Sequence, residues 1–420
     1  MKKLFSLLAC TMMAISLTGC GSSGSSSKNV FNFASELDII SLDSTKANDG
    51  MSFNAIHAFT DGLMGRDKDG NTSNALAESY EVSDDGLTYT FKLKDAKWSN
   101  GDPVTANDFV YSWRKIIQEA GNYAYMLGTD GAGVKNADKL MADQEAGKTL
   151  DDKAMETLGI TAKDDKTLVI ELENPCPFFL DLMTFPCYYP QNEKFVEEQG
   201  KNYATSAETT LSNGAYKLTA WEKGSKATFE KNNDYYNADA VKLEELNMLL
   251  VQDPKTAAMN FDSKANDYCT INSELVDKYK TTENFKQIPE GYLFYLQINF
   301  KNEDLANANI RKALSYAINR QDFTDNVLKD GSLPAAGFVP TKLSTGPDGK
   351  DFRETADKYT DYNLEEAQKY FDAGLKELGK DSIDLRLLYG TDESPMDTMA
   401  EYLQNAFSKL NGLNIEMVAT

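Results

Sequence analysis

The stretch "NALAESYEVSDDGLTYTFKLKDAKWSNGDPVTANDFVYSWRK", residues 74–115, contains a strand pattern, a turn and a helix in that order. Apolar and polar residues alternate through "GLTYTFKLKDAKW" (86–98), which predicts a half-buried strand. "SNGD" (99–102) holds the Asn-Gly pair that is typical of a tight turn. Thr105 and Asp108 have the spacing of a capping box, and the apolar residues after them recur with helical period. We therefore predict a helix that begins at Thr105.

The same two kinds of pattern continue along the chain. Three further stretches alternate as antiparallel strands do, at 164–173, 214–221 and 226–232. Two others have helical period, at 308–323 and 363–378, and the second begins with an asparagine suited to an N-cap. There is no internal repeat. The chain is therefore predicted to be a mixed α/β protein with several sheets.

The first residues have the features of a secretory signal. Lys2 and Lys3 form a positively charged start, and the mostly apolar run at 4–17 follows them. That run is too short to cross a bilayer of roughly 30 Å as a stop-transfer helix. We predict a signal peptide over residues 1–19.

"LTGC" (17–20) resembles a bacterial lipobox, whose cysteine receives a diacylglycerol and becomes the new N-terminus. Cys20 would then anchor the chain in the membrane, and the Gly/Ser-rich residues within 20–29 would form a flexible tether. Ordinary cleavage, with Cys20 as a spare thiol, is the alternative. Lipid anchoring places the body of the protein on the outer face of the cytoplasmic membrane, in the periplasmic space or on a Gram-positive cell surface.

Size and charge limit the classes of function. About 400 mature residues exceed what one hydrophobic core holds, so two or more lobes are expected. The chain has 65 acidic against 43 basic residues and a formal charge of −22. Such a field disfavours nucleic acid and anionic lipid surfaces as partners.

The mature cysteines do not form a disulfide scaffold. Apart from Cys20 they are Cys176, Cys187 and Cys269, an odd number. Cys176 and Cys187 flank the apolar stretch "PFFLDLMTFP" and are a candidate disulfide in an oxidising compartment.

The residues offer little for catalysis or for metal binding. His57 is the only histidine, which excludes an HExxH zinc site. A Ser-His-Asp triad or a Cys-His pair would have to use His57. We favour a packed structural role for this residue. "AGKT" (146–149) imitates the end of a P-loop but lacks the first glycine, so we predict a plain loop. "DKDGNTSNALAE" (67–78) has calcium-loop spacing with its glycine misplaced, and a hairpin turn is favoured. We predict no enzyme activity, no metal and no cofactor.

The stretch 74–115 resembles the bacterial extracellular solute-binding proteins of the oligopeptide/dipeptide ABC-importer family. The resemblance continues through 211–239, 293–302, 310–323 and "GFVP" at 337–340, in the order of the family. It covers nearly all of the chain after the tether, and the lipobox is similar to that of members tethered to the membrane.

This resemblance implies a two-lobed clamshell, the periplasmic-binding-protein-like fold with an extra inserted subdomain. The first lobe would comprise 28–60 and 191–291, the inserted subdomain 61–190, and the second lobe 292–420. Members usually exceed 500 residues, and their acidic anchor for the α-amino group of the ligand would lie beyond Thr420. The second lobe is therefore expected to be truncated.

The resemblance also implies a peptide ligand held through its main chain. A permease and an ATPase would be separate chains, and we expect a monomer. The same fold binding an oligosaccharide, a nickel complex or haem is an alternative, as is a peptide-sensing lipoprotein. Every site residue also has a structural alternative, because tyrosines pack in cores, Asn-Asp-Gly forms turns, and the alternation in "YLFYLQIN" (292–299) is typical of a strand. The residues placed at the ligand are Asn48, Asp49, Gly50, Tyr123, Tyr125, Thr270, Asn272, Tyr295, Gln297 and Asn299.

Overall fold

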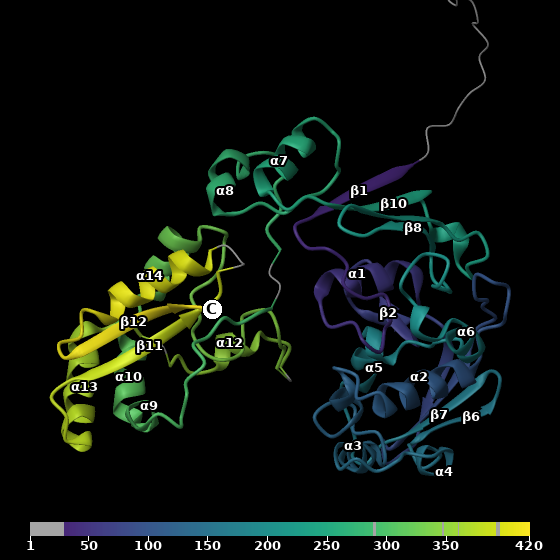
Figure 1. The fold of residues 1–420 in the computed structure, drawn as a ribbon, viewed down its shortest axis with the longest axis horizontal. Helices are drawn as coiled ribbons and strands as arrows, with labels where there is room; N and C mark the ends of the chain where they lie inside the picture. Colours follow the sequence, from purple (N-terminus) through teal and green to yellow (C-terminus); the bar gives the residue numbers. More distant parts are fainter. Residues whose placement is uncertain (1–28, 289–290, 347, 360, 392–394) are drawn as a thin grey trace, which may run out of the picture. The chain divides into compact units, whose positions relative to one another are not determined.

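The computed structural model of the chain (Figure 1) describes residues 29–288, 291–346, 348–359, 361–391 and 395–420. The predicted signal peptide, Cys20 and most of the tether lie outside the described residues. No helix in the described part is both long enough and apolar enough to cross a membrane.

The chain forms two compact units, the first ending at Cys269 and the second beginning at Thr270. The sequence placed the corresponding boundary later, between residues 291 and 292. Gln287 belongs to the second unit, where its Nε2 donates a hydrogen bond to Gly331 O at 2.7 Å. The lobe limits given by the family resemblance stay a prediction.

One four-stranded sheet of the first unit joins the start of the chain to a segment more than 200 residues later (Figure 1). Its strands, in spatial order, are β1 (Val30–Ser35), β10 (Glu245–Leu250), β9 (Lys226–Lys231) and β8 (Tyr216–Glu222). β1 and β10 are parallel, and the other pairs are antiparallel. Helix α1 (Gly50–Phe59) contributes Ile56 and Phe59 to a core that also includes Phe229.

The stretch that opened the sequence analysis lies in the second sheet of this unit. Its strands are β4 (Ala77–Val82), β5 (Thr88–Leu93), β7 (Thr167–Glu171) and β6 (Ile160–Asp164), in that order and all antiparallel. Helix α2 (Ala106–Gln118) has Thr105 as its N-cap residue, and Thr105 N donates to Asp108 Oδ2 at 2.8 Å. Trp113 on α2 and Phe91 on β5 lie in the same core. The predicted strand and helix are confirmed.

Short elements connect these sheets. The stretch with calcium-loop spacing begins with the turn of a hairpin, which joins β2 (Met64–Arg66) to β3 (Thr72–Asn74), as favoured from the sequence. "AGKT" lies in a turn and loop, also as predicted. The remaining elements of the first unit are α3 (Ala137–Glu145), α4 (Asp152–Met155), α5 (Phe179–Leu182), α6 (Glu193–Gln199), α7 (Pro254–Asp262), and the 3-10 helices η1 (Ala124–Leu127), η2 (Pro186–Tyr188), η3 (Gly200–Asn202) and η4 (Ala238–Ala240).

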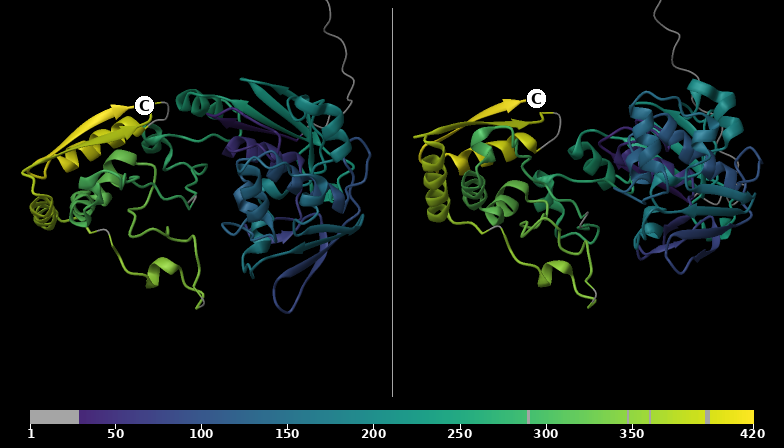
Figure 2. Two further views of the ribbon diagram at one scale, coloured as in Figure 1. Left: turned by 60° about the horizontal axis from the view of Figure 1, so that its bottom comes forward. Right: turned by 90° about the horizontal axis from the view of Figure 1, so that it is seen from below.

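The second unit has its own core, in which helices pack beside two parallel strands (Figure 2). Ile310 on α10 and Phe371 on α13 are both fully buried there. Asn363 caps α13 by accepting a hydrogen bond from Glu366 N, as its position predicted. The elements are α8 (Ser273–Tyr279), α9 (Glu303–Ala306), α10 (Ala308–Ala317), α11 (Arg320–Asp322), the π-helix η5 (Phe323–Leu328), α12 (Phe352–Thr355), α13 (Leu364–Leu378), β11 (Ile383–Tyr389), α14 (Met396–Phe407) and β12 (Leu413–Ala419).

Two expectations are wrong in the structure. The alternating residues 292–299 do not form a strand, because no other segment of the described chain pairs with them. Cys176 and Cys187 are free thiols instead of a disulfide. Both cysteines are buried in the core around α2, where they pack as small apolar side chains. Burial raises the pKa of both thiols, so each stays protonated.

Candidate ligand-binding site

The strip Asn48, Asp49 and Gly50 lies at the start of α1. Asp49 is the N-cap residue, and its carboxylate accepts hydrogen bonds from Ser52 N at 2.8 Å and from Ser52 Oγ at 2.6 Å. Asn48 and Gly50 are exposed, and a Cβ added at Gly50 would meet nothing within 4 Å. The Asp49 carboxylate is therefore occupied by the helix cap, whereas the chain at Asn48 and Gly50 has open space for a ligand.

Aromatic rings from three segments lie beside this strip. Phe53, one turn along α1, makes edge-to-face contacts with Tyr123 at 5.6 Å and with Phe185 at 4.9 Å between ring centroids. Tyr123 contacts Tyr125 at 5.9 Å, and the Tyr125 side chain is 47% exposed. The structure thus places Tyr123 against Phe53, one turn of α1 from the strip, and Tyr125 next to Tyr123. We did not predict Phe53 or Phe185 as site residues, because each lies in an apolar run whose pattern indicates only a hydrophobic core.

A buried polar network holds the turn that precedes the strip. Lys115 on α2 forms an ion pair with Asp43, with Nζ to Oδ2 at 2.9 Å. Burial alone would raise the pKa of Asp43, but the charge of Lys115 and hydrogen bonds from Lys115, Thr45 and Gln191 outweigh it and lower the pKa. Nothing in the local sequence pattern marked Lys115, because its partners lie far away in the chain.

The two candidate residues near the unit boundary lie just after an anchored segment. Tyr268 stacks on Phe33 of β1 with ring centroids 4.9 Å apart, and Asp267 Oδ2 accepts a hydrogen bond from Asn32 N at 2.8 Å. Thr270 follows and is exposed. Asn272 is the N-cap residue of α8, and its Oδ1 is buried without a hydrogen-bond partner in the described chain.

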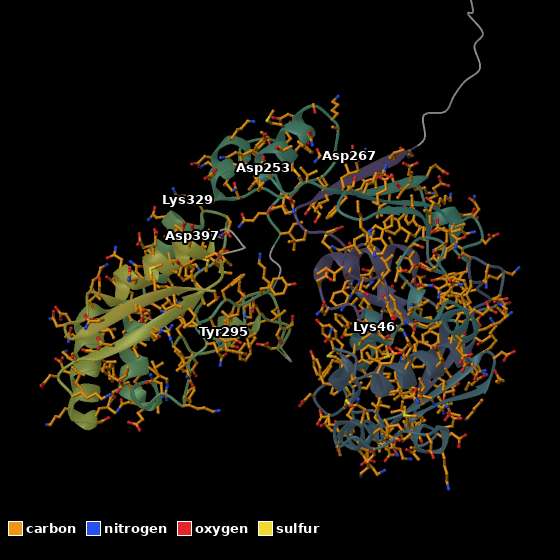
Figure 3. All side chains as sticks on the ribbon, in the orientation of Figure 1. Lys46, Asp253, Asp267, Tyr295, Lys329 and Asp397 are labelled. Atoms are coloured by element: carbon orange, nitrogen blue, oxygen red, sulfur yellow. The ribbon has the colours of Figure 1, made fainter. Side chains whose placement is uncertain are left out.

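The remaining candidates belong to the second unit, where Figure 3 labels Tyr295. Tyr295, Gln297 and Asn299 are all exposed, Tyr295 to 67%. The Tyr295 ring lies 6.5 Å from that of Phe338, a residue of the "GFVP" element. Asn299 Oδ1 accepts a hydrogen bond from Lys301 N at 3.0 Å, which is a turn contact. The structure thus places the predicted ring of Tyr295 near the exposed ring of Phe338, which was not predicted as a site residue.

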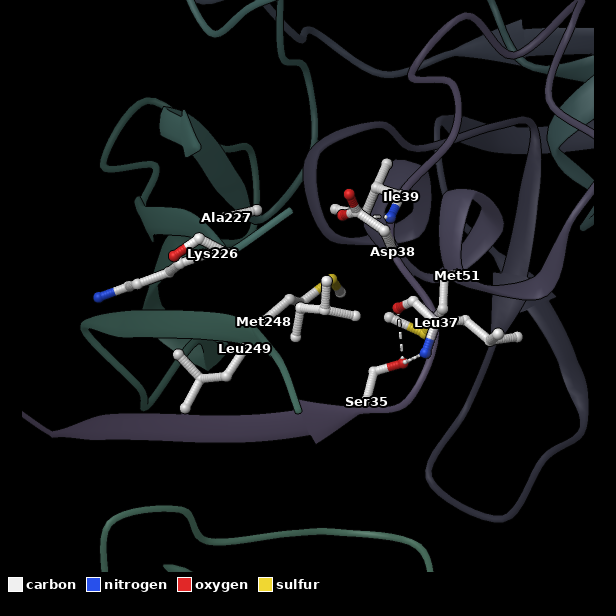
Figure 4. A pocket seen from close by; sticks show the side chains of 11 residues that line it. Ser35, Leu37, Asp38, Ile39, Met51, Lys226, Ala227, Met248 and Leu249 are labelled. Carbon is white, nitrogen blue, oxygen red and sulfur yellow. Dashed lines mark hydrogen bonds between the residues drawn. The ribbon is translucent and has the colours of Figure 1, made fainter. Parts of the chain in front are cut away.

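Two further features do not belong to a ligand site. His57 Nδ1 lies 2.8 Å from Tyr189 Oη, and the two rings make an edge-to-face contact with centroids 5.6 Å apart. His57 therefore has a structural partner as favoured, although the residue stays partly exposed. A cavity beside the end of β1 (Figure 4) is lined by Ser35, Met51 and Met248 among others. Its volume is about 10 Å³, which at most admits one water molecule.

These features are typical of a binding protein. The open main chain and exposed rings suit the binding of a solute, and no catalytic constellation surrounds them in the described residues. Comparison with known sequences is consistent with this class: the chain belongs to the bacterial extracellular solute-binding proteins of family 5, whose sequence profile matches residues 71–420.

Individual relatives are similar over almost the whole chain. The dipeptide-binding protein of Lactococcus lactis subsp. cremoris is 35% identical, over 97% of this chain and 75% of the relative. The oligopeptide-binding protein OppA of Bacillus subtilis is 32% identical, over 98% of this chain and 74% of the relative. The structure of Listeria monocytogenes OppA bound to peptide has a TM-score of 0.80 at 36% identity, covering 94% of this chain and 77% of that one.

The comparisons confirm three predictions. The family is the one that the motifs resemble, and the fold is its mixed α/β, two-lobed clamshell. Members are transport binding proteins, so the chain is not an enzyme. The site residues and the limits of the inserted subdomain stay predictions.

Proposed function

We propose that this protein is a lipid-anchored receptor that captures oligopeptides between two lobes and delivers them to the permease of an ABC importer. The observation that carries the proposal is the open strip at Asn48 and Gly50 beside the rings of Tyr123 and Tyr125. Similar proteins are described as dipeptide-binding or oligopeptide-binding, and one similar structure contains a peptide.

The physical basis is recognition of the peptide main chain. Backbone donors and acceptors recur at every residue, so a strip of open main chain can hold peptides of varied sequence. The rings of Tyr123 and Tyr125 provide apolar contact area at low entropic cost. Thr270, Asn272, Tyr295, Gln297 and Asn299 complete the proposed set. The first lobe would comprise residues 28–60 and 191–291, with residues 61–190 as its inserted subdomain. The second lobe would comprise residues 292–420. The protein would work as a monomer.

Peptide binding can be tested with a bulky side chain on the strip. Gly50→Phe should lower the affinity for a peptide at least tenfold, because the new ring would fill the space in front of the main chain. A tryptic digest of casein serves as the probe, with bound peptides identified by native mass spectrometry and titrated by calorimetry. Tyr80→Ala, at an exposed aromatic residue on β4, is the matched control and should bind normally. Binding of haem or oligosaccharides but no peptides would refute the proposal.

The membrane anchor has an independent test. Cys20→Ala should release the protein into the medium while peptide affinity stays unchanged, because the residue lies before β1 and the tether. Fractionation of cells followed by calorimetry on the released protein measures both. Retention of the variant on the membrane would contradict the lipid anchor without affecting the peptide proposal.

A further inference from the structure

The ammonium group of Lys115 holds three separate parts of the chain together. Besides its ion pair with Asp43, Nζ donates to Thr45 Oγ1 at 3.0 Å and to Gln191 Oε1 at 3.0 Å. A lysine has three donors, and all three are used here. Asp43 and Gln191 lie 72 and 76 residues away from Lys115 in sequence.

The partners of Lys115 also bind one another. Gln191 Nε2 donates to Asp43 Oδ1 at 2.8 Å and to Ser44 Oγ at 3.0 Å, and Thr45 N donates to Asp43 Oδ1 at 3.0 Å. The exposed fraction of each of the five residues is between 1% and 6%. A buried network in which every member is satisfied favours one geometry, because breaking any bond leaves a charge or dipole without a partner.

The network leads directly to the strip. Asp43 O accepts hydrogen bonds from Lys46 N at 2.9 Å and from Ala47 N at 2.8 Å, which forms a tight turn. Asn48 is the next residue. The place of the strip at the start of α1 therefore depends on the turn 43–47, and the turn is held by Lys115.

The same turn contacts the loop that carries the tyrosines. Asn122 Nδ2 donates to Lys46 O at 3.3 Å. Gly121 approaches so closely that a Cβ there would lie 2.5 Å from Thr45 O. Tyr123 follows, and the loop begins three residues after the end of α2, the helix of Lys115.

We infer that Lys115 is a positioning residue for ligand binding, which acts through Asp43 and Thr45 on both the strip Asn48–Gly50 and the rings of Tyr123 and Tyr125. Lys115 is only 6% exposed, so it lies beneath the surface that a ligand would contact. This inference rests on the proposed function for its effect on affinity, but its effect on the turn is independent of any ligand. A site that is organised before the ligand arrives saves the entropic cost of ordering it on binding.

The test compares Lys115→Met with Leu140→Ala. Leu140 is 1% exposed in the core around α2, so its truncation destabilises the same unit without touching the network. Hydrogen exchange of the full-length protein without ligand is the first measurement. We expect the amides of Lys46 and Ala47 to exchange at least tenfold faster in Lys115→Met than in the wild-type protein. Leu140→Ala should not show this increase when the two variants are compared at equal global stability.

Affinity for peptides from the casein digest is the second measurement. Lys115→Met should bind at least tenfold more weakly than Leu140→Ala. If Lys115→Met does not fold, Thr45→Val decides, because it removes one acceptor of the ammonium at nearly constant shape; its expected losses are three- to tenfold. Exchange rates and affinities equal to those of Leu140→Ala would overturn the inference. If Lys115→Met exchanges faster but the wild-type protein binds no peptide, the proposed function alone is refuted.

Discussion

The carboxyl group of Asp108 should make the stability of the first unit depend on pH. Asp108 closes the first turn of α2, where its Oδ2 accepts hydrogen bonds from Thr105 N at 2.8 Å and from Trp98 Nε1 at 3.1 Å. The residue is only 7% exposed. Burial raises its pKa from 3.8 to about 6, although these hydrogen bonds act in the opposite direction.

The size and sign of the effect follow from this pKa. The folded protein holds the proton more tightly than the unfolded chain, so the stabilisation by Asp108 is complete below pH 3.8 and is lost as the pH rises through about 6. Each pKa unit corresponds to about 1.4 kcal/mol, so the full change is roughly 3 kcal/mol. Asp108→Asn keeps an acceptor for Thr105 and Trp98 but cannot ionise. Its stability relative to wild type should therefore rise by about 2.4 kcal/mol between pH 4 and pH 7.5, because the unfolded chain is already partly ionised at pH 4.

Urea unfolding measured at several pH values gives this difference. All three tryptophans, Trp98, Trp113 and Trp221, precede Cys269, so their fluorescence reports the first unit. Asp152→Asn is the matched control, because Asp152 is an exposed carboxylate in the first turn of α4. A relative stability of Asp108→Asn that stays constant from pH 4 to pH 7.5 would refute the reasoning.

Three further predictions concern packing and thiol chemistry. Phe371→Ala should destabilise the second unit by about 3–5 kcal/mol, because Phe371 is fully buried; circular dichroism should show this loss while the tryptophan transition stays in place. Gly214→Ala should destabilise the first unit by about 1–3 kcal/mol, since its Cβ would lie 2.9 Å from the backbone of Phe59, and an unchanged urea midpoint would contradict this. Cys176 and Cys187 should resist alkylation at pH 7.5 until guanidinium is added, because burial raises the pKa of both thiols. An intact mass two units below that of the reduced protein would show a disulfide instead.

Local elements could be predicted because their signals are local. The helix at Thr105 depends on a cap and an apolar stripe within thirteen residues, and both are present in "TANDFVYSWRKII". The strip Asn48–Gly50 and the tyrosines at 123 and 125 came from a family resemblance instead. The structure adds that Asp49 serves as a helix cap, which the resemblance did not indicate.

The network around Lys115 could not be predicted from pattern. Asp43 and Gln191 approach it only after the chain has folded, and in so acidic a sequence a single aspartate carries no signal. The strand expected at 292–299 failed for a related reason. Alternation records which side chains could share a face, whereas a strand also needs a partner to complete its hydrogen bonds, and the described chain provides none there.

The parallel pairing of β1 with β10 also determines the order in which the first unit can fold. Asn32 on β1 hydrogen-bonds to Asn247 on β10, across 215 residues of chain. The sheet β4-β5-β7-β6 needs only residues up to 171, so it can close while the chain is still being made. β1 is synthesised first and is completed last, because closing so long a loop is entropically slow. A chain ending before residue 245 would therefore keep the sheet β4-β5-β7-β6 but leave β1 without its partner β10.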